Sequence, residues 1–106
     1  MFSRNVSMRL KPNTLSAFTQ TLEKEVLPVL RKQPGFRDEI AFESEGGINV
    51  TVISLWDSKE QAETYEKAAF PAVLKSFEKM LDGAPTVRVS TVISSTLHKL
   101  AIVMAA

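Results

Sequence analysis

The stretch Ile48-Asn49-Val50-Thr51-Val52-Ile53-Ser54-Leu55-Trp56 decides the fold of this 106-residue chain. It is rich in β-branched residues and apolar on both sides, which favours a strand inside a sheet. Directly after it, Asp57 and Ser58 compete as the N-cap of a helix, each followed three residues later by an acid or an amide, as in a capping box. The only tryptophan of the chain therefore stands where a central strand meets a helix. A large ring at that place can be a packing anchor or the wall of a ligand pocket.

Before this stretch, the pattern predicts a strand, a helix and a second strand. Residues 2–10 alternate with a period of two, which places Phe2, Arg4, Val6, Met8 and Leu10 on one side. Asn13 is the expected N-cap of an amphipathic helix of about five turns, which Pro28 should interrupt. The turn Gln33-Pro34-Gly35-Phe36 leads into a strand over 36–44, and Glu45-Gly46-Gly47 predicts a hairpin.

After the stretch, the pattern predicts a helix pair and a last strand. A break near Ala68–Ala69 separates the helix that carries Tyr65 from a helix with Pro71 in its first turn. A fourth strand over 86–96 and an apolar tail over 97–106 follow. The order is the βαββαβ pattern of an α+β, ferredoxin-like fold, with one four-stranded antiparallel sheet and the helices on one face. We expect a single domain over 1–106 with its core over 2–96.

Composition is that of an ordinary globular protein and excludes several classes of function. The net charge is +1, without the concentrated basic face that nucleic-acid binding needs. There is no cysteine, which excludes disulfides, thiolate metal sites and a cysteine nucleophile. No residues show the spacing of metal ligands, so we expect no metal. No signal peptide or membrane span is indicated, so we expect a cytoplasmic protein without membrane partners.

The helices can cover only one face of the sheet, so the other face must meet solvent or a partner. The third strand is apolar on both sides, whereas the other strands carry polar sides. These polar sides hold Asn5, Ser7, Arg9, Arg37, Glu39, Glu43, Arg88 and Ser90. Because uncovered apolar surface is disfavoured, we expect a homodimer with a cavity between the two sheets. The alternative is a monomer whose tail folds back.

Three motifs are similar to those of one known family. They are Gln33-Pro34-Gly35-Phe36, residues 50–60 with Trp56-Asp57-Ser58, and Tyr65 with the helix from Phe70 to Met80. Together they resemble the antibiotic biosynthesis monooxygenase (ABM) family of dimeric α/β barrels, over about residues 2–96. The resemblance implies a homodimer with the helices outside and a pocket in each subunit. Some members oxidise polycyclic phenols or quinols with O₂ and no cofactor, others degrade haem, and many have no known activity.

Haem degradation does not fit the sequence. The resemblance implies that haem-degrading members use a helix histidine, a first-strand asparagine and the tryptophan of the third strand. Trp56 matches, but the helix position falls near Leu74, and the single histidine, His98, lies in the tail. Without an axial imidazole the haem iron has no ligand, so we expect no cofactor.

A cofactor-independent oxygenase needs a dry pocket that holds an aromatic ring and stabilises its anion. The candidate catalytic residues are Trp56 to stack on the ring, Asn5 and Arg37 to stabilise the oxyanion, and Tyr65 to relay a proton. The candidate substrate-binding residues are Arg9, Glu39, Ser54 and Arg88. The asparagine that such enzymes carry four residues before the tryptophan is Val52 here.

Each candidate also fits a structural role. Trp56 and Tyr65 can be packed core residues, and the charged strand residues can form cross-strand surface pairs. Two functions therefore stay open. The first is a monooxygenase acting on a small aromatic or quinol substrate, and the second is a non-catalytic dimeric ligand-binding or stress-associated barrel. A buried pocket lined by Trp56 with Asn5, Arg37 or Arg88 favours the first, and a collapsed cavity favours the second.

Overall fold

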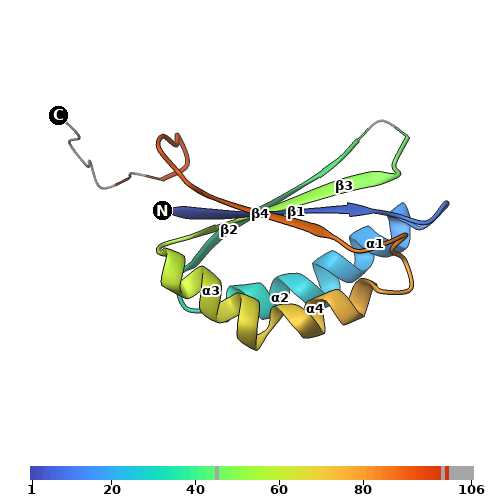
Figure 1. Ribbon diagram of the computed structural model, residues 1–106, viewed down its shortest axis with the longest axis horizontal. Helices are drawn as coiled ribbons and strands as arrows, with labels where there is room; N and C mark the ends of the chain where they lie inside the picture. Colours follow the sequence, from blue (N-terminus) through green and yellow to red (C-terminus); the bar gives the residue numbers. More distant parts are fainter. Residues whose placement is uncertain (45, 99, 101–106) are drawn as a thin grey trace.

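The computed structural model describes residues 1–44, 46–98 and 100. Its elements are β1 (Phe2–Arg9), α1 (Leu15–Thr21), η1 (Leu22–Val26), α2 (Leu27–Arg31), β2 (Phe36–Glu43), β3 (Asn49–Trp56), α3 (Lys59–Ala68), α4 (Phe70–Phe77) and β4 (Thr86–Thr91). The strands form one antiparallel sheet in the order β2-β3-β1-β4, and the helices lie together on one side of it (Figure 1). This confirms the predicted α+β, ferredoxin-like fold with β3 inside the sheet.

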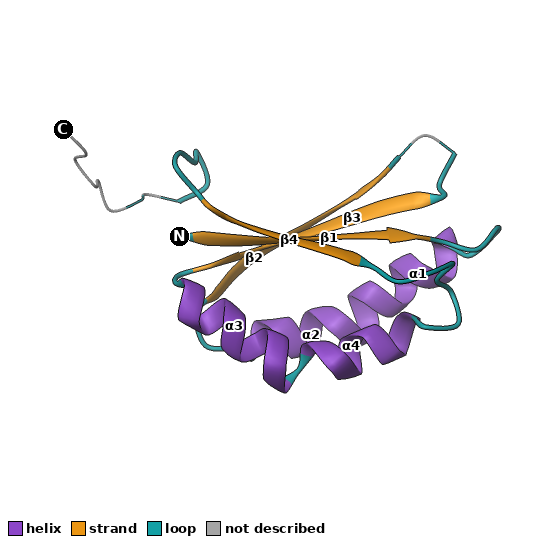
Figure 2. Cartoon of the chain, viewed as in Figure 1, coloured by secondary structure: helices purple, strands orange, loops and turns teal. Residues whose placement is uncertain are grey.

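The sheet has a covered face, which packs on the helices, and a bare face on its other side (Figure 2). The even-numbered residues of β1 and β3 belong to the covered face, and nearly all of them are buried. They are Phe2, Arg4, Val6, Met8, Val50, Val52, Ser54 and Trp56. The odd-numbered residues of the same strands, among them Asn5, Ser7, Ile53 and Leu55, belong to the bare face. The alternation predicted for residues 2–10 is therefore confirmed.

Strand β2 departs from the expected placement because of a β-bulge between Phe36 and Asp38. Beyond the bulge, Glu39 lies opposite Ser54 of the covered face, and Ile40 lies opposite Ile53 of the bare face. One extra residue in a strand shifts its side-chain alternation by one, so polar and apolar sides exchange faces. The expectation that Glu39 and Glu43 share the uncovered side with Asn5 and Arg88 is therefore wrong.

The first helical segment is broken into α1, the π-helical turn η1 and α2. The π-helical turn ends at Val26, two residues before Pro28, which has no backbone N–H to continue the helix. The predicted interruption near Pro28 is therefore confirmed. Asn13 is not the N-cap. It has a positive φ of 62°, which asparagine tolerates, and the N-cap position belongs to Thr14.

The elements after β3 follow the prediction except at the end of β4. Ser58 caps α3, since its Oγ accepts a hydrogen bond from the Gln61 N–H, and α4 begins after a break at Ala69. Strand β4 ends at Thr91 and not at residue 96, because its partner β1 begins opposite it at Phe2. The predicted tail lies partly outside the described residues. In the part of the chain that the structure describes, no helix has the length and apolar character to cross a bilayer.

Candidate active site

Trp56 is fully buried at the end of β3, inside an aromatic cluster. Its ring stacks on Tyr65 of α3 with a centroid separation of 5.0 Å and an interplanar angle of 29°. The Phe36 ring at the start of β2 meets the Trp56 ring edge-on, with a centroid separation of 5.5 Å and an interplanar angle of 71°. The indole Nε1–H donates to Ser54 Oγ at 2.9 Å. With its ring packed and its donor satisfied, Trp56 is held as a rigid anchor of the junction between β3 and α3.

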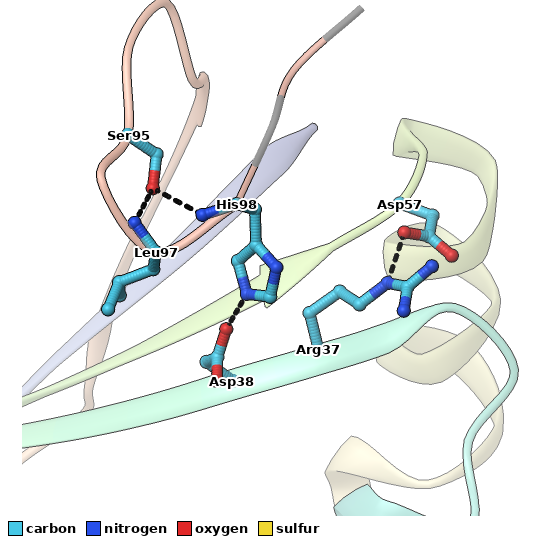
Figure 3. Close-up of polar contacts among 6 residues, drawn as sticks. All are labelled: Arg37, Asp38, Asp57, Ser95, Leu97 and His98. Carbon is cyan, nitrogen blue, oxygen red and sulfur yellow. Dashed lines mark hydrogen bonds and ion pairs between the residues drawn. The ribbon is translucent and has the colours of Figure 1, made fainter.

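Two of the recognised motifs meet at this junction. The backbone N–H of Asp57 donates to the carbonyl of Gly35 at 2.8 Å, and Arg37 Nε lies 2.5 Å from Asp57 Oδ1 (Figure 3). Gly35 has a φ of 80°, and a Cβ there would overlap the side-chain amide of Gln61. The Pro-Gly turn is thus fixed against the start of α3. The hydrogen bond to Asp57, followed by the carboxylate charge, raises the pKa of Arg37.

A small, partly open cavity lies between the covered face and the helices. Its volume is about 30 Å³, room for roughly one or two water molecules. Three polar side chains line it, Arg4, Ser54 and Tyr65. The remaining wall is apolar: Val6, Met8, Leu22, Val26, Leu30, Val52, Phe70, Val73, Leu74 and Phe77. Of the predicted site residues, this cavity brings Ser54 and Tyr65 together, while Trp56 lies behind Tyr65.

Arg4 is the functional candidate that the sequence analysis did not single out. It is only 2% exposed, and its guanidinium carbon lies 4.4 Å from the Phe70 ring centroid and 5.3 Å from that of Tyr65. One terminal nitrogen is 3.4 Å from Glu66 Oε1. Among the described residues, its Nε finds no hydrogen-bond partner. The signal that could have found it is a charged residue on the apolar side of the alternation in residues 2–10.

Tyr65 is tuned by its burial in this cluster. Burial raises the pKa of Tyr65 to about 12, although the positive charge of Arg4 acts in the opposite direction. At neutral pH its hydroxyl is therefore protonated. Tyr65 can donate a hydrogen bond to a bound anion, but it is a poor proton acceptor in this state.

Three of the predicted site residues, Asn5, Arg9 and Arg88, lie on the bare face, across the sheet from the cavity. Asn5 and Arg88 are register partners on the bare face, and the Asn5 Oδ1 is buried without a partner among the described residues. Arg9 is exposed and forms an ion pair with Asp82 at 3.5 Å. Neither Asn5, Arg37 nor Arg88 lines the cavity. Their assigned roles stay predictions, which would require a second site or a partner on the bare face.

Glu39 lies in a separate, open groove of about 400 Å³ between β2 and the first helical segment. Leu15, Phe18, Leu22, Ala41 and Val50 are among the apolar residues along this groove. Burial raises the pKa of Glu39, the charge of Glu23 adds to the effect, and Arg31 opposes it. Within the described residues, no group of three acidic, histidine or cysteine side chains is placed to hold a metal ion.

The segment after β4 returns to the bare side of β2. His98 Nε2 contacts Asp38 Oδ2, and the backbone N–H groups of Leu97 and His98 donate to Ser95 Oγ (Figure 3). His98 is thus paired with a carboxylate, far from the cavity. Ile40 and Phe42 of the bare face still stay exposed, at 39% and 53%.

Solved structures with the same fold support this arrangement. The monooxygenase ActVA-Orf6 of Streptomyces coelicolor, solved with the ligand nanaomycin D, has a TM-score of 0.76 at 19% identity, and the match covers 92% of each chain. A protein of unknown function from Nitrosomonas europaea has a TM-score of 0.76 at 16% identity, covering 92% of this chain and 94% of that one. Rv0793 from Mycobacterium tuberculosis has a TM-score of 0.70 at 16% identity, covering 90% and 97%.

The sequence itself matches a family model. A comparison with curated protein sequences finds no match. The model described as antibiotic biosynthesis monooxygenase, in contrast, matches residues 1–80, which include the Pro-Gly turn, Trp56, Tyr65 and Arg4. This match spans most of the chain, and the solved structures share its fold. The chain therefore belongs to the antibiotic biosynthesis monooxygenase family.

Proposed function

We propose that the protein is a cytoplasmic, cofactor-independent monooxygenase that acts on a small aromatic or quinol substrate between the covered face and the helices. The observation that carries the proposal is the buried guanidinium of Arg4, which lines an otherwise apolar cavity beside Tyr65 and Ser54. Membership of the family supports an oxygenase. The similarly folded ActVA-Orf6, which was solved with nanaomycin D, supports a ligand site in this fold.

The chemistry requires a phenol to lose its proton and the resulting electron-rich anion to react with O₂. One oxygen atom enters the ring and the other leaves as water, so that a phenol and O₂ give a quinone and water. The positive charge of Arg4 favours the phenolate over the phenol, and the Tyr65 hydroxyl can donate a hydrogen bond to it. The apolar wall excludes bulk water, which strengthens both interactions.

Substrate binding requires the cavity to expand. A volume of about 30 Å³ is well below the roughly 300 Å³ at which ordinary ligand pockets begin. The helical cover is interrupted at η1 and at Ala69, so these are the places where it can move. The small volume favours the second candidate function, a non-catalytic dimeric ligand-binding or stress-associated barrel. So does the lining, which contains neither Trp56 nor any of Asn5, Arg37 and Arg88.

Oxygen uptake with a panel of hydroquinones and naphthols tests the proposal. We expect Arg4→Gln to lower the rate by about 10²-fold or more, because a donor to the developing anion is lost. Trp56→Phe should have a smaller effect, since Trp56 lies behind Tyr65. The control is Lys75→Gln, which removes a cation from the exposed side of α4 and should keep the wild-type rate. If wild-type protein consumes no oxygen with any substrate, the non-catalytic function is favoured instead.

We further propose that the protein is a homodimer in which a second copy covers the bare face. Ile40 and Phe42 are exposed there beside Ile53 and Leu55, and apolar side chains gathered on one face are typical of an interface. Light scattering should give the mass of a dimer for wild-type protein. Ile53→Lys should shift the mass towards the monomer, whereas Ala72→Lys on the exposed side of α4 should not. A wild-type mass of one chain would contradict this proposal.

A further inference from the structure

We infer that the cavity selects a ligand with a negatively charged group on an aromatic ring, such as a small aromatic acid, and that this group displaces Glu66 from Arg4. The inference rests on the proposed function, because it concerns the same cavity. Beyond the proposed function, it specifies that the substrate carries a negative charge and that Glu66 competes with this charge for Arg4.

Arg4 has more hydrogen-bonding capacity than its neighbours use. A guanidinium offers five N–H donors in one plane, and within the described part of the chain its only ion pair runs from one terminal nitrogen to Glu66. The Nε–H is buried and has no partner among the described residues. Because an unpaired buried donor is costly, an anion that can reach it gains more than it would at an exposed arginine. A carboxylate also matches the planar fork of donors.

Glu66 is a weak and exchangeable partner. Its side chain is 46% exposed on α3, and its Oε1 lies at the long distance of 3.4 Å from the guanidinium. An ion pair with one solvated member contributes little, so Glu66 can turn to solvent at small cost. Arg4 itself does not need Glu66 to keep its position, since its guanidinium packs over the Phe70 and Tyr65 rings.

The other residues that line the cavity determine which kind of molecule can bring the negative charge to Arg4. Among the residues that line the cavity, Arg4 is the only charged one, and Ser54 already accepts the indole N–H of Trp56. The other walls are aliphatic and aromatic side chains, which favour a flat apolar body. A neutral amide of the same shape would fill the space without compensating the guanidinium. A charged group on an aromatic ring satisfies both parts of the wall.

Binding of benzoate and benzamide, two ligands of the same shape and different charge, tests the inference. The fluorescence of Trp56 reports binding, because this single tryptophan stacks on Tyr65 of the cavity wall. We expect wild-type protein to bind benzoate at least about tenfold more tightly than benzamide, as a charged hydrogen-bonded pair implies. Arg4→Gln should remove this preference. Arg4→Lys, which keeps the charge and loses the planar fork, should reduce it without removing it.

Glu66→Gln provides the sharper test, since the substituted residue is partly exposed and need not disturb the core. We expect it to tighten benzoate binding by about two- to fivefold, the value of an exposed ion pair, and to leave benzamide binding unchanged. The matched control is Glu63→Gln, also on α3, whose carboxylate pairs with Lys59 at 3.9 Å. It should leave both affinities unchanged.

Three results would overturn the inference: equal affinity for the two ligands, no binding of either, or weaker benzoate binding by Glu66→Gln. Failure of the proposed function gives a different result. A preference for benzoate without oxygen uptake on any substrate would remove the oxygenase and keep the anion site. Oxygen uptake on neutral quinols without a preference for benzoate would remove the anion site and keep the oxygenase.

Discussion

The covered face of the sheet buries a cation among aromatic rings, whereas the bare face leaves large apolar side chains exposed. Arg4 is 2% exposed, and Phe42 is 53% exposed. Both side chains belong to strands of one sheet, so residue type alone does not decide burial. What decides it is which side of each strand meets the helices. The covered face is packed within one chain, whereas Ile40 and Phe42 of the bare face are exposed.

The largest expected difference in stability is between substitutions of two phenylalanines, one packed between the covered face and the helices and one on the bare face. Phe18 is 2% exposed and stacks on Phe77 at 4.6 Å, while Phe42 lies on the bare face. Phe18→Ala should lower the free energy of unfolding by about 3–5 kcal/mol, because it leaves a cavity in the core. Phe42→Ala should change the stability of a dilute single chain by only about 0.5 kcal/mol. Urea denaturation measures both, and equal losses would remove the distinction between the faces.

Alkaline pH should weaken the covered face through Tyr65. Its pKa is raised to about 12, chiefly by burial, so the folded state holds the phenolic proton more tightly than the unfolded state does. The resulting stability is present below pH 10 and is lost as the pH rises from about 10 to 12. The loss is on the order of 2–3 kcal/mol at full ionisation.

Denaturation curves at pH 9 and pH 11.5, recorded for wild-type protein and for Tyr65→Phe, measure this loss. The variant has no phenol at this position, so its stability should fall less over the same interval. A parallel decline of the two proteins would mean that Tyr65 is not the group responsible.

The smallest expected difference in stability is between the losses of two serine hydrogen bonds, one on each face. On the covered face, Ser54 Oγ accepts from the buried Trp56 indole at 2.9 Å, and on the bare face Ser7 lies 3.4 Å from the Thr51 hydroxyl. Ser54→Ala should cost about 1–2 kcal/mol, because the indole N–H is left buried and unpaired. Ser7→Ala should change stability by at most about 0.5 kcal/mol, since water replaces its partner. Thermal unfolding of the two variants side by side checks this order.

The candidate site was only partly predictable. The residue types of Ser54, Trp56 and Tyr65 identified one junction, because a strand end followed by a capped helix is a local pattern. The sequence pattern did not identify Arg4 as a site residue, although the same alternation placed it with the apolar residues of β1. Its significance depends on Phe70 and on Glu66, which is 62 residues away in the chain. Contacts over such distances are set by packing, and no local pattern records them.

The sequence by itself determined the order of elements, the alternation along β1 and β3, the interruption before Pro28 and the break at Ala69. These features follow from backbone preferences and side-chain periodicity, which act over a few residues. Only the tertiary structure decided which side of β2 faces the helices, because one bulged residue at its start reverses the alternation. It also decided that a buried arginine lines the cavity while Asn5 and Arg88 lie across the sheet from it. Register and packing between distant segments determine these positions, and they are properties of the assembled sheet.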